Sequence, residues 1–104
     1  MVIVELNIIP LGVGVSVSRF LVPALKELKK RKVKYEITSM CTIFEAKDVN
    51  EALKIVEAAH KATFKANVKR VITTIRIDDR KDKKGSMEEK VKALKTQLEE
   101  KKMY

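Results

Sequence analysis

Two stretches of the chain alternate between apolar and polar residues in the way typical of a strand with one buried face. In residues 2–9 every even position is aliphatic, whereas the odd positions include Glu5 and Asn7. Residues 69–78 alternate again, with Val71, Thr73, Ile75 and Ile77 on one face and Ile72, Thr74, Arg76 and Asp78 on the other. We therefore predict a strand in each stretch, with the more apolar face of each directed toward a core.

Three other stretches, residues 20–28, 49–64 and 87–98, carry apolar residues at the helical period of 3.6. The expected caps are Ser16 or Ser18 for the first helix, Asp48 with Glu51 for the second and Ser86 with Glu89 for the third. Pro23 fits a helix only near its first turn, so the first helix is expected to begin late or to bend there. Asn67 is placed to end the second helix because Asn tolerates the left-handed backbone conformation.

Residues 33–46 are rich in strand-forming types and are interrupted around residues 39–41, so we expect two strands there. The order is then strand, helix, strand, strand, helix, strand and a terminal helix. Two such split βαβ units form a ferredoxin-like α+β sandwich, in which an antiparallel sheet carries two helices on one face. The terminal helix is expected to turn Met87, Val91, Leu94 and Leu98 inward.

The length and the 45% apolar content fit one domain over residues 1–104 with a single core. Because both main helices lie on one side of the predicted sheet, the other face needs cover if its apolar residues are to leave water. The candidates on that face are Ile3, Ile9, Phe44 and Ile72. We therefore expect the protein to associate with itself, either sheet to sheet or edge to edge.

Composition excludes several classes of protein. No apolar run approaches the roughly 20 residues that span a bilayer, and residues 1–10 are expected to form a strand rather than a signal peptide. The single cysteine, Cys41, and the single histidine, His60, cannot form an internal disulfide or a metal cluster within one chain. We expect a cytoplasmic protein with no membrane partner.

The formal charge of +9 comes from 23 Lys and Arg against 14 Asp and Glu. Such a balance suggests nucleic acid, because clustered cations release counterions from phosphates. An RNA-recognition sheet, however, stacks bases on aromatic side chains, and the predicted strands offer only Tyr35 and Phe44. Abundant Lys and Glu are also typical of heat-adapted proteins. We interpret the charge as the solvated surface of a thermophile's protein, and nucleic acid is not the expected partner.

The residues offer no convincing catalytic pair. Gly12 and Gly14 lie between a strand and a helix, but Val17 stands where a dinucleotide fingerprint needs a small residue. His60 lies on the apolar stripe of the second helix and Cys41 is of a type that is usually buried, so neither is expected to act on a substrate. The segment Asp78–Arg80 fits either a cation or polar ligand or a loop ion pair. We expect no enzyme activity and no cofactor.

Several short motifs occur in an order that resembles the small thiamine-binding proteins of the YkoF-like superfamily. They are Pro10–Gly12 with Ser16 and Ser18, Tyr35, Met40–Thr42 with Glu45, Ala59–Ala62, Arg70–Val71, Asp78–Arg80 and Lys90–Val91. The resemblance covers nearly the whole chain. It implies a ferredoxin-like domain that dimerises through its sheets and commonly forms homotetramers. It also implies binding of thiamine or its hydroxymethylpyrimidine part, without catalysis. Cys41, Ala46 and Asn67 stand where the family usually has Gly.

The chemistry of thiamine suggests what such a pocket contains. Its thiazolium is cationic, and one carboxylate can meet the ring nitrogen and the amino group of the aminopyrimidine at two points. We expect Glu45 or Asp78 to supply that carboxylate. The other expected ligand-binding residues are Asn7, Ser16, Ser39 and Thr42, with Met40 and Phe44 flanking the ring. An alternative stays open, in which the strand acids pair with Arg70, Arg76 or Arg80 across neighbouring strands.

The sequence thus predicts a non-catalytic protein that binds thiamine or hydroxymethylpyrimidine in a pocket at the sheet or subunit interface. The alternative is a regulatory or interaction module of the same fold that binds an anionic metabolite or RNA through its basic loops. The two differ in their dependence on salt, because binding driven by phosphate weakens steeply as salt rises, whereas a buried aminopyrimidine contact changes little.

Overall fold

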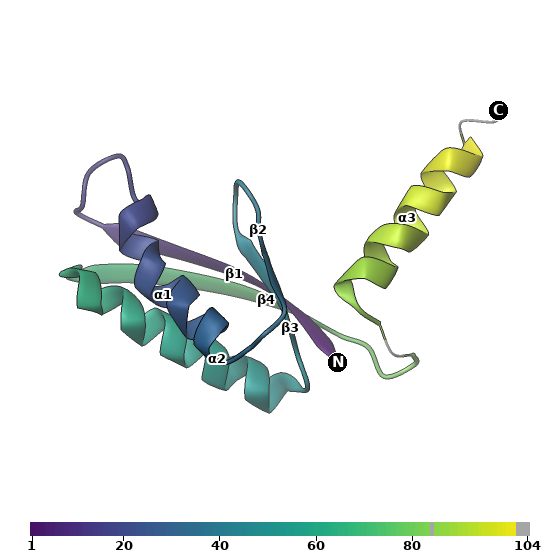
Figure 1. Cartoon of the computed structure of the whole chain (residues 1–104), viewed down its shortest axis with the longest axis horizontal. Coiled ribbons are helices and arrows are strands. Elements are labelled where there is room, and N and C mark those ends of the chain that lie inside the picture. Colours follow the sequence, from purple (N-terminus) through teal and green to yellow (C-terminus); the bar gives the residue numbers. More distant parts are fainter. Residues whose placement is uncertain (84, 102–104) are drawn as a thin grey trace.

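A four-stranded antiparallel sheet in the order β2-β3-β1-β4 forms the centre of the computed structural model, which describes residues 1–83 and 85–101. Helices α1 and α2 cover one face of this sheet (Figure 1). The elements are β1 (Val2–Leu11), α1 (Ser18–Lys30), β2 (Tyr35–Ile37), β3 (Thr42–Ala46), α2 (Val49–Thr63) with the 3-10 turn η1 (Phe64–Ala66), β4 (Arg70–Asp79) and α3 (Met87–Lys101). The predicted ferredoxin-like α+β sandwich with an additional C-terminal helix is confirmed.

The core lies between the sheet and the two helices. The even residues of β1 from Val2 to Ile8 are buried there, together with Leu28 of α1 and Ile55 of α2. Phe44 is fully buried in this core as well. The expectation that Phe44 lies on the uncovered face is wrong, because Phe44 pairs with Val4 and residues paired across strands share a face.

The opposite face of the sheet, called here the open face, carries the odd residues of β1. The strand register places Ile3 between Glu45 and Asp78, and Glu5 between Ile43 and Arg76. Farther along the same face Ile9 pairs with Ile72, and these two side chains are 41% and 44% exposed. The open face is therefore partly acidic at one end and apolar at the other.

Helix α1 departs from its predicted beginning. Its N-cap is Val17, and neither Ser16 nor Ser18 caps it with a side chain. The amide of Phe20 instead donates to the carbonyl of Val17 at 2.9 Å, which closes the first turn without a hydroxyl. The helix also runs on through Pro23, which removes only one hydrogen bond of the helix ladder.

The other predicted helix ends are confirmed. Asp48 Oδ1 accepts a hydrogen bond from the Glu51 amide at 2.8 Å, and Ser86 Oγ accepts one from the Glu89 amide at 3.2 Å. Asn67 ends the turn after α2 with a φ of 62°, in the left-handed region. These three sites depend only on neighbours in the sequence, which is why the pattern predicts them well.

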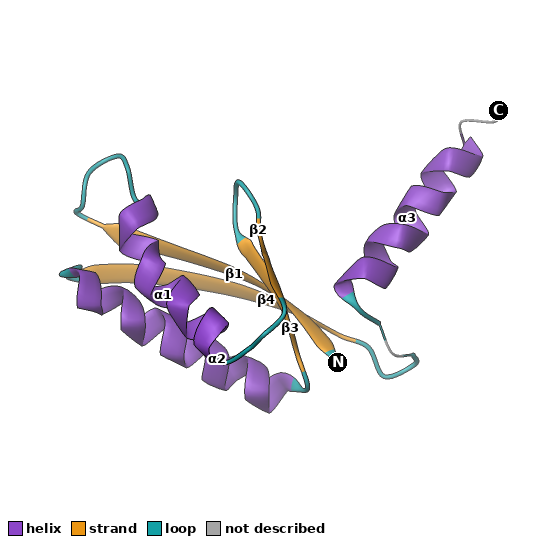
Figure 2. Cartoon of the chain, viewed as in Figure 1, coloured by secondary structure: helices purple, strands orange, loops and turns teal. Residues whose placement is uncertain are grey.

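Helix α3 stands apart from the two-layer body and extends away from it (Figure 2). Met87 in its first turn is buried against the open face, as predicted. The prediction that Val91, Leu94 and Leu98 also turn inward is wrong, because all three are at least half exposed. Within the part of the chain that the structure places, none of the helices has the length and apolar character needed to cross a membrane.

Candidate functional site

A cavity of about 430 Å³ lies on the helix side of the sheet, and we call it the helix-side cavity. Its apolar wall comes from Leu21, Leu25 and Leu28 of α1. Residues 6–9 of β1, residues 37–42 around the turn between β2 and β3, and Val17, Ser18 and Ala24 complete the lining. A volume of this size is within the usual range for small-molecule sites.

The cavity exists because β1 is longer than its neighbour β3. The pairing of these two strands ends at Leu6 and Thr42, whereas β1 continues to Leu11 with β4 on its other side. Residues 7–11 of β1 therefore have one edge without a neighbouring strand. Part of this edge borders the cavity, where backbone N–H and C=O groups require other partners.

Thr38 fixes the turn that closes the other side of the cavity. Its Oγ1 donates to the carbonyl of Cys41 at 2.8 Å and accepts the amides of Met40 and Cys41 at 3.2 and 3.0 Å. The Thr38 amide also donates to the Cys41 carbonyl at 2.8 Å. The sequence reasoning missed Thr38, although a Thr just before a break between two strands is typical of such turns.

Four of the residues predicted to bind a ligand line the helix-side cavity. They are Asn7, Ser39, Met40 and Thr42. Asn7 borders the cavity at the free strand edge, but it pairs with Thr74, so its side chain lies on the open face. Ser16 lies exposed in the loop before α1, where Ser18 lines the cavity in its place. Phe44 is enclosed in the core and does not line this cavity.

A second cavity of about 450 Å³, the sheet-side cavity, lies between the open face and the start of α3. Ile3 and Ile43 form its apolar base, and its carboxylates are Glu5, Glu36 and Asp78. Each cavity thus has only part of the expected chemistry, because the hydroxyl groups line the helix-side cavity and the carboxylates line the sheet-side cavity.

The carboxylate of Asp78 is already engaged. Lys90 of α3 donates a hydrogen bond to Asp78 Oδ2, and this contact holds the pKa of Asp78 below its usual range. Glu5 lies 3.9 Å from Arg76 Nη1, as one predicted alternative has it. Arg80 pairs with Asp82 at 2.5 Å, which lowers the pKa of Asp82 to about 2. The structure therefore pairs these acids with cations of the same chain.

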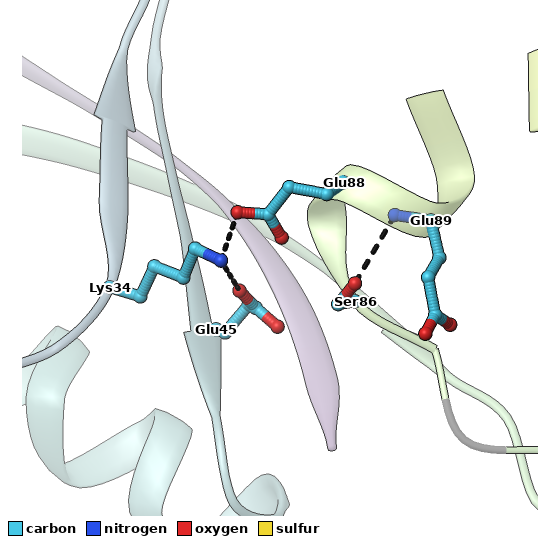
Figure 3. Close-up of polar contacts among 5 residues, drawn as sticks. All are labelled: Lys34, Glu45, Ser86, Glu88 and Glu89. Carbon is cyan, nitrogen blue, oxygen red and sulfur yellow. Dashed lines mark hydrogen bonds and ion pairs between the residues drawn. The ribbon is translucent and has the colours of Figure 1, made fainter. Parts of the chain in front are cut away.

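Glu45 is the most deeply buried acid of this region. Its side chain is 3% exposed, and its Oε2 has no hydrogen-bond donor but lies 3.7 Å from Lys34 Nζ (Figure 3). Lys34 also forms an ion pair with Glu88 of α3. The hydrogen bond to Glu88 raises the pKa of Lys34, and the same bond lowers the pKa of Glu88. Glu45 thus belongs to the contact between sheet and α3 and does not line the helix-side cavity.

His60 packs beside β4, away from both cavities. His60 Nδ1 lies 2.6 Å from Thr73 Oγ1 with the ring against Phe64, and the histidine lines neither cavity. Among residues 1–83 and 85–101, no group of three or more His, Cys, Asp or Glu side chains is placed to hold a metal ion. The helix-side cavity offers an apolar wall, hydroxyl groups and a free strand edge.

A family model and two relatives match this chain over most of its length. The family model described as thiamine-binding protein matches residues 4–95. A UPF0045 protein of Methanothermobacter thermautotrophicus is 41% identical over 99 residues, which cover 94% of this chain and 100% of the relative. The UPF0045 protein YqgV of Bacillus subtilis is 36% identical over 104 residues, covering 95% and 99% of the two chains.

Solved structures share the fold. A hypothetical protein of Methanocaldococcus jannaschii has a TM-score of 0.81 and 41% identity, with 89% of this chain and 94% of that chain covered. A candidate thiamine biosynthesis/salvage protein of Thermotoga maritima has a TM-score of 0.76 at 20% identity, with coverage of 89% and 97%. At that identity the second likeness extends to the fold alone.

Proposed function

Because the chain belongs to the thiamine-binding protein family, whose model matches residues 4–95, we propose that it binds thiamine or its hydroxymethylpyrimidine part in the helix-side cavity. The proposed role is binding without catalysis. The observation that carries the proposal is the free edge of β1 beside Asn7, which borders a cavity with apolar and hydroxyl-bearing walls.

The free strand edge is complementary to an aminopyrimidine. In an antiparallel strand the N–H and C=O groups of one residue point to the same side, so every second residue from 7 to 11 directs its polar groups toward this edge. An aminopyrimidine places a ring nitrogen that accepts a hydrogen bond beside an amino group that donates one. The ring can therefore pair with one strand residue at two points, as a neighbouring strand would.

The side chains around this edge complete the proposed site. Ser39 and Thr42 supply two hydroxyls for the remaining polar atoms of the ligand. Met40 lies exposed at the rim, where its thioether can lie against the ring. The aliphatic wall of α1 covers the opposite side. Glu45 and Asp78 take no part in the proposed site, because they lie on the open face, where Lys34 and Lys90 pair with them.

Isothermal titration calorimetry with thiamine and with hydroxymethylpyrimidine tests the proposal. We expect heat of binding for at least one of them at high micromolar ligand, and Thr42→Val should weaken binding about tenfold because one buried hydrogen bond is lost. The matched control is Thr74→Val on the open face, which should bind as the natural chain does. Absence of heat with both ligands contradicts the proposal. Loss of binding on Glu45→Gln but not on Thr42→Val moves the site to the sheet side.

We also propose that copies of the chain associate through the open face of the sheet. Ile9 and Ile72 support this, because they are neighbours in the register, exposed and apolar. Ile72→Lys should then shift the sedimentation coefficient toward that of a monomer at micromolar concentration. A natural chain that is already monomeric there contradicts this second proposal.

A further inference from the structure

Helix α3 carries an apolar stripe that its own chain leaves in solvent. Val91, Leu94 and Leu98 are 50%, 70% and 57% exposed, and every described side chain from residue 88 to residue 99 is exposed. The three residues are spaced by three and by four positions, as the a and d positions of a coiled coil are. We propose that this stripe pairs with the α3 helix of a second copy of the chain, and that the two helices run antiparallel.

The shape of the molecule shows that α3 lacks support from its own body. The radius of gyration is 15.9 Å, against about 13 Å for a folded chain of this length, and the longest extent is 52 Å. Figure 1 shows the helix extending away from the sheet after its first turn. A helix of 15 residues is marginal in water without tertiary packing, so an amphipathic helix in this position needs a partner.

The charges beside the stripe match those of a second, antiparallel copy. With Val91 at position a and Leu94 at position d, Glu88 and Lys95 both take position e. In an antiparallel pair the e positions of the two helices face each other. Glu88 of each copy then lies opposite Lys95 of the other, which gives two symmetric pairs of opposite charge.

The same charges disfavour a parallel pair. In that arrangement the g position of one heptad faces the e position of the next heptad on the other helix. Lys90 occupies the g position of one heptad, and Lys95 occupies the e position of the next. A parallel pair would therefore place Lys90 of each copy opposite Lys95 of the other copy. In the antiparallel pair Lys90 instead faces the neutral Gln97. The pattern of charge therefore selects one direction and one register.

Glu88 can serve both contacts. Its ion pair with Lys34 uses Oε1, which leaves Oε2 for Lys95 of the second copy (Figure 3). The contact between Lys34, Glu45 and Glu88 holds the start of α3 on the sheet. In the proposed pair, Glu45, Lys34 and Glu88 of one copy and Lys95 of the second copy therefore form a row of alternating charges.

The register also affects the sheet-side cavity. If Val91 faces Leu94 of the second copy, Leu98 of that copy lies opposite Met87. Met87 and Val91 line the sheet-side cavity, so the second copy covers its entrance. Stable interfaces bury roughly 1,200 Å² or more, and we expect two short helices to fall short of that, so the contact should be weak and reversible when it acts without other interfaces.

Disulfide cross-linking of the full chain tests direction and register together. In a Cys41→Ser background, we compare Val91→Cys alone, Leu94→Cys alone and an equal mixture of the two under mild oxidation. The antiparallel pair should give a disulfide dimer mainly in the mixture, because position 91 faces position 94. Thr96→Cys, on the opposite side of the helix, is the control and should stay uncrosslinked. Dimers of equal yield in the single variants, or none in the mixture, overturn the proposal.

A charge reversal gives an independent measurement. Lys95→Glu places a carboxylate at position 95 opposite Glu88 of the other copy, so that two negative charges face each other. This change should weaken the association about tenfold, as read from the cross-linking yield over a dilution series. Lys92→Glu makes the same change of charge outside the interface and should have little effect. Equal effects of the two variants contradict the register. Because the readout depends on positions 91 and 94, association through Ile72 on the open face does not imitate it.

Discussion

Lys32 adopts a backbone conformation that few residues other than Gly and Asn take. Its φ is 58°, and the amides of Lys32 and Val33 donate to the carbonyls of Lys29 and Leu28, which ends α1 in a Schellman-type turn. The left-handed region costs a residue with a Cβ about 1 kcal/mol relative to Gly. Lys32→Gly should therefore raise the free energy of unfolding by about that amount, as measured by chemical denaturation.

The matched control for Lys32 is the other left-handed residue. Asn67 has a φ of 62°, but Asn tolerates this region better than Lys does, so Asn67→Gly should stabilise the chain less. If Lys32→Gly instead lowers the free energy of unfolding, the lysine side chain stabilises the folded chain by more than its left-handed backbone destabilises it.

Glu45 and Lys34 form a pair whose partners are unequal in burial. The side chain of Glu45 is 3% exposed and that of Lys34 is 54% exposed. Lys34→Met should destabilise the chain more than Glu45→Gln does, because it leaves a buried carboxylate facing apolar neighbours and Glu88. In a Glu45→Gln background the same lysine substitution should cost much less, and thermal unfolding of the four chains measures this difference. Additive effects would contradict the coupling.

At the scale of the element, α3 is held to the sheet by ion pairs that titrate in acid. Lys90 lowers the pKa of Asp78, and Lys34 lowers that of Glu88, from ordinary values of 3.8 and 4.5. A lowered pKa stabilises the docked state above the ordinary value, and this stabilisation is lost as the pH falls through the lowered value. We expect the α3 contact to weaken below about pH 4.

Hydrogen exchange of the backbone amides in residues 90–95 measures this weakening. Protection there, measured against the intrinsic exchange rate at each pH, should fall in acid before the amides of β1 lose protection. Lys90→Met is the control, since without its partner Asp78 no longer contributes and the acid dependence should become smaller. Parallel loss of protection in α3 and β1 would contradict separate release of the helix.

The helices and strands show which features of the fold could be predicted from the sequence. The ends at Asp48, Ser86 and Asn67 follow from local chemistry and were predictable. The period of α3 indicates that one face must be covered, but it does not show what covers it. The prediction that Leu94 turns toward the core of its own chain therefore fails.

The candidate site depends on the lengths of the strands. Thr42 lies beside the free edge of β1 because β1 extends past the end of β3, and no spacing in the sequence shows where that pairing stops.

At the scale of the whole molecule, the question is how a chain of charge +9 accommodates a cationic ligand. Among the described residues that line the helix-side cavity none is charged, so the field of the distant lysines is the main electrostatic term there. That field opposes thiamine but not neutral hydroxymethylpyrimidine. Added salt screens it, since the Debye length falls from roughly 10 Å at 0.1 M to roughly 3 Å at 1 M.

The salt dependence of binding therefore separates the proposed function from its alternative. Between 50 and 200 mM salt, thiamine should bind equally well or slightly more tightly, and hydroxymethylpyrimidine should be unaffected. RNA bound through the basic loops would lose affinity steeply over the same range, because each neutralised phosphate releases counterions. Calorimetry for the two small ligands and fluorescence anisotropy for a labelled RNA give the three slopes. Tight RNA binding with a steep slope, beside absent heat for both ligands, would favour the alternative module.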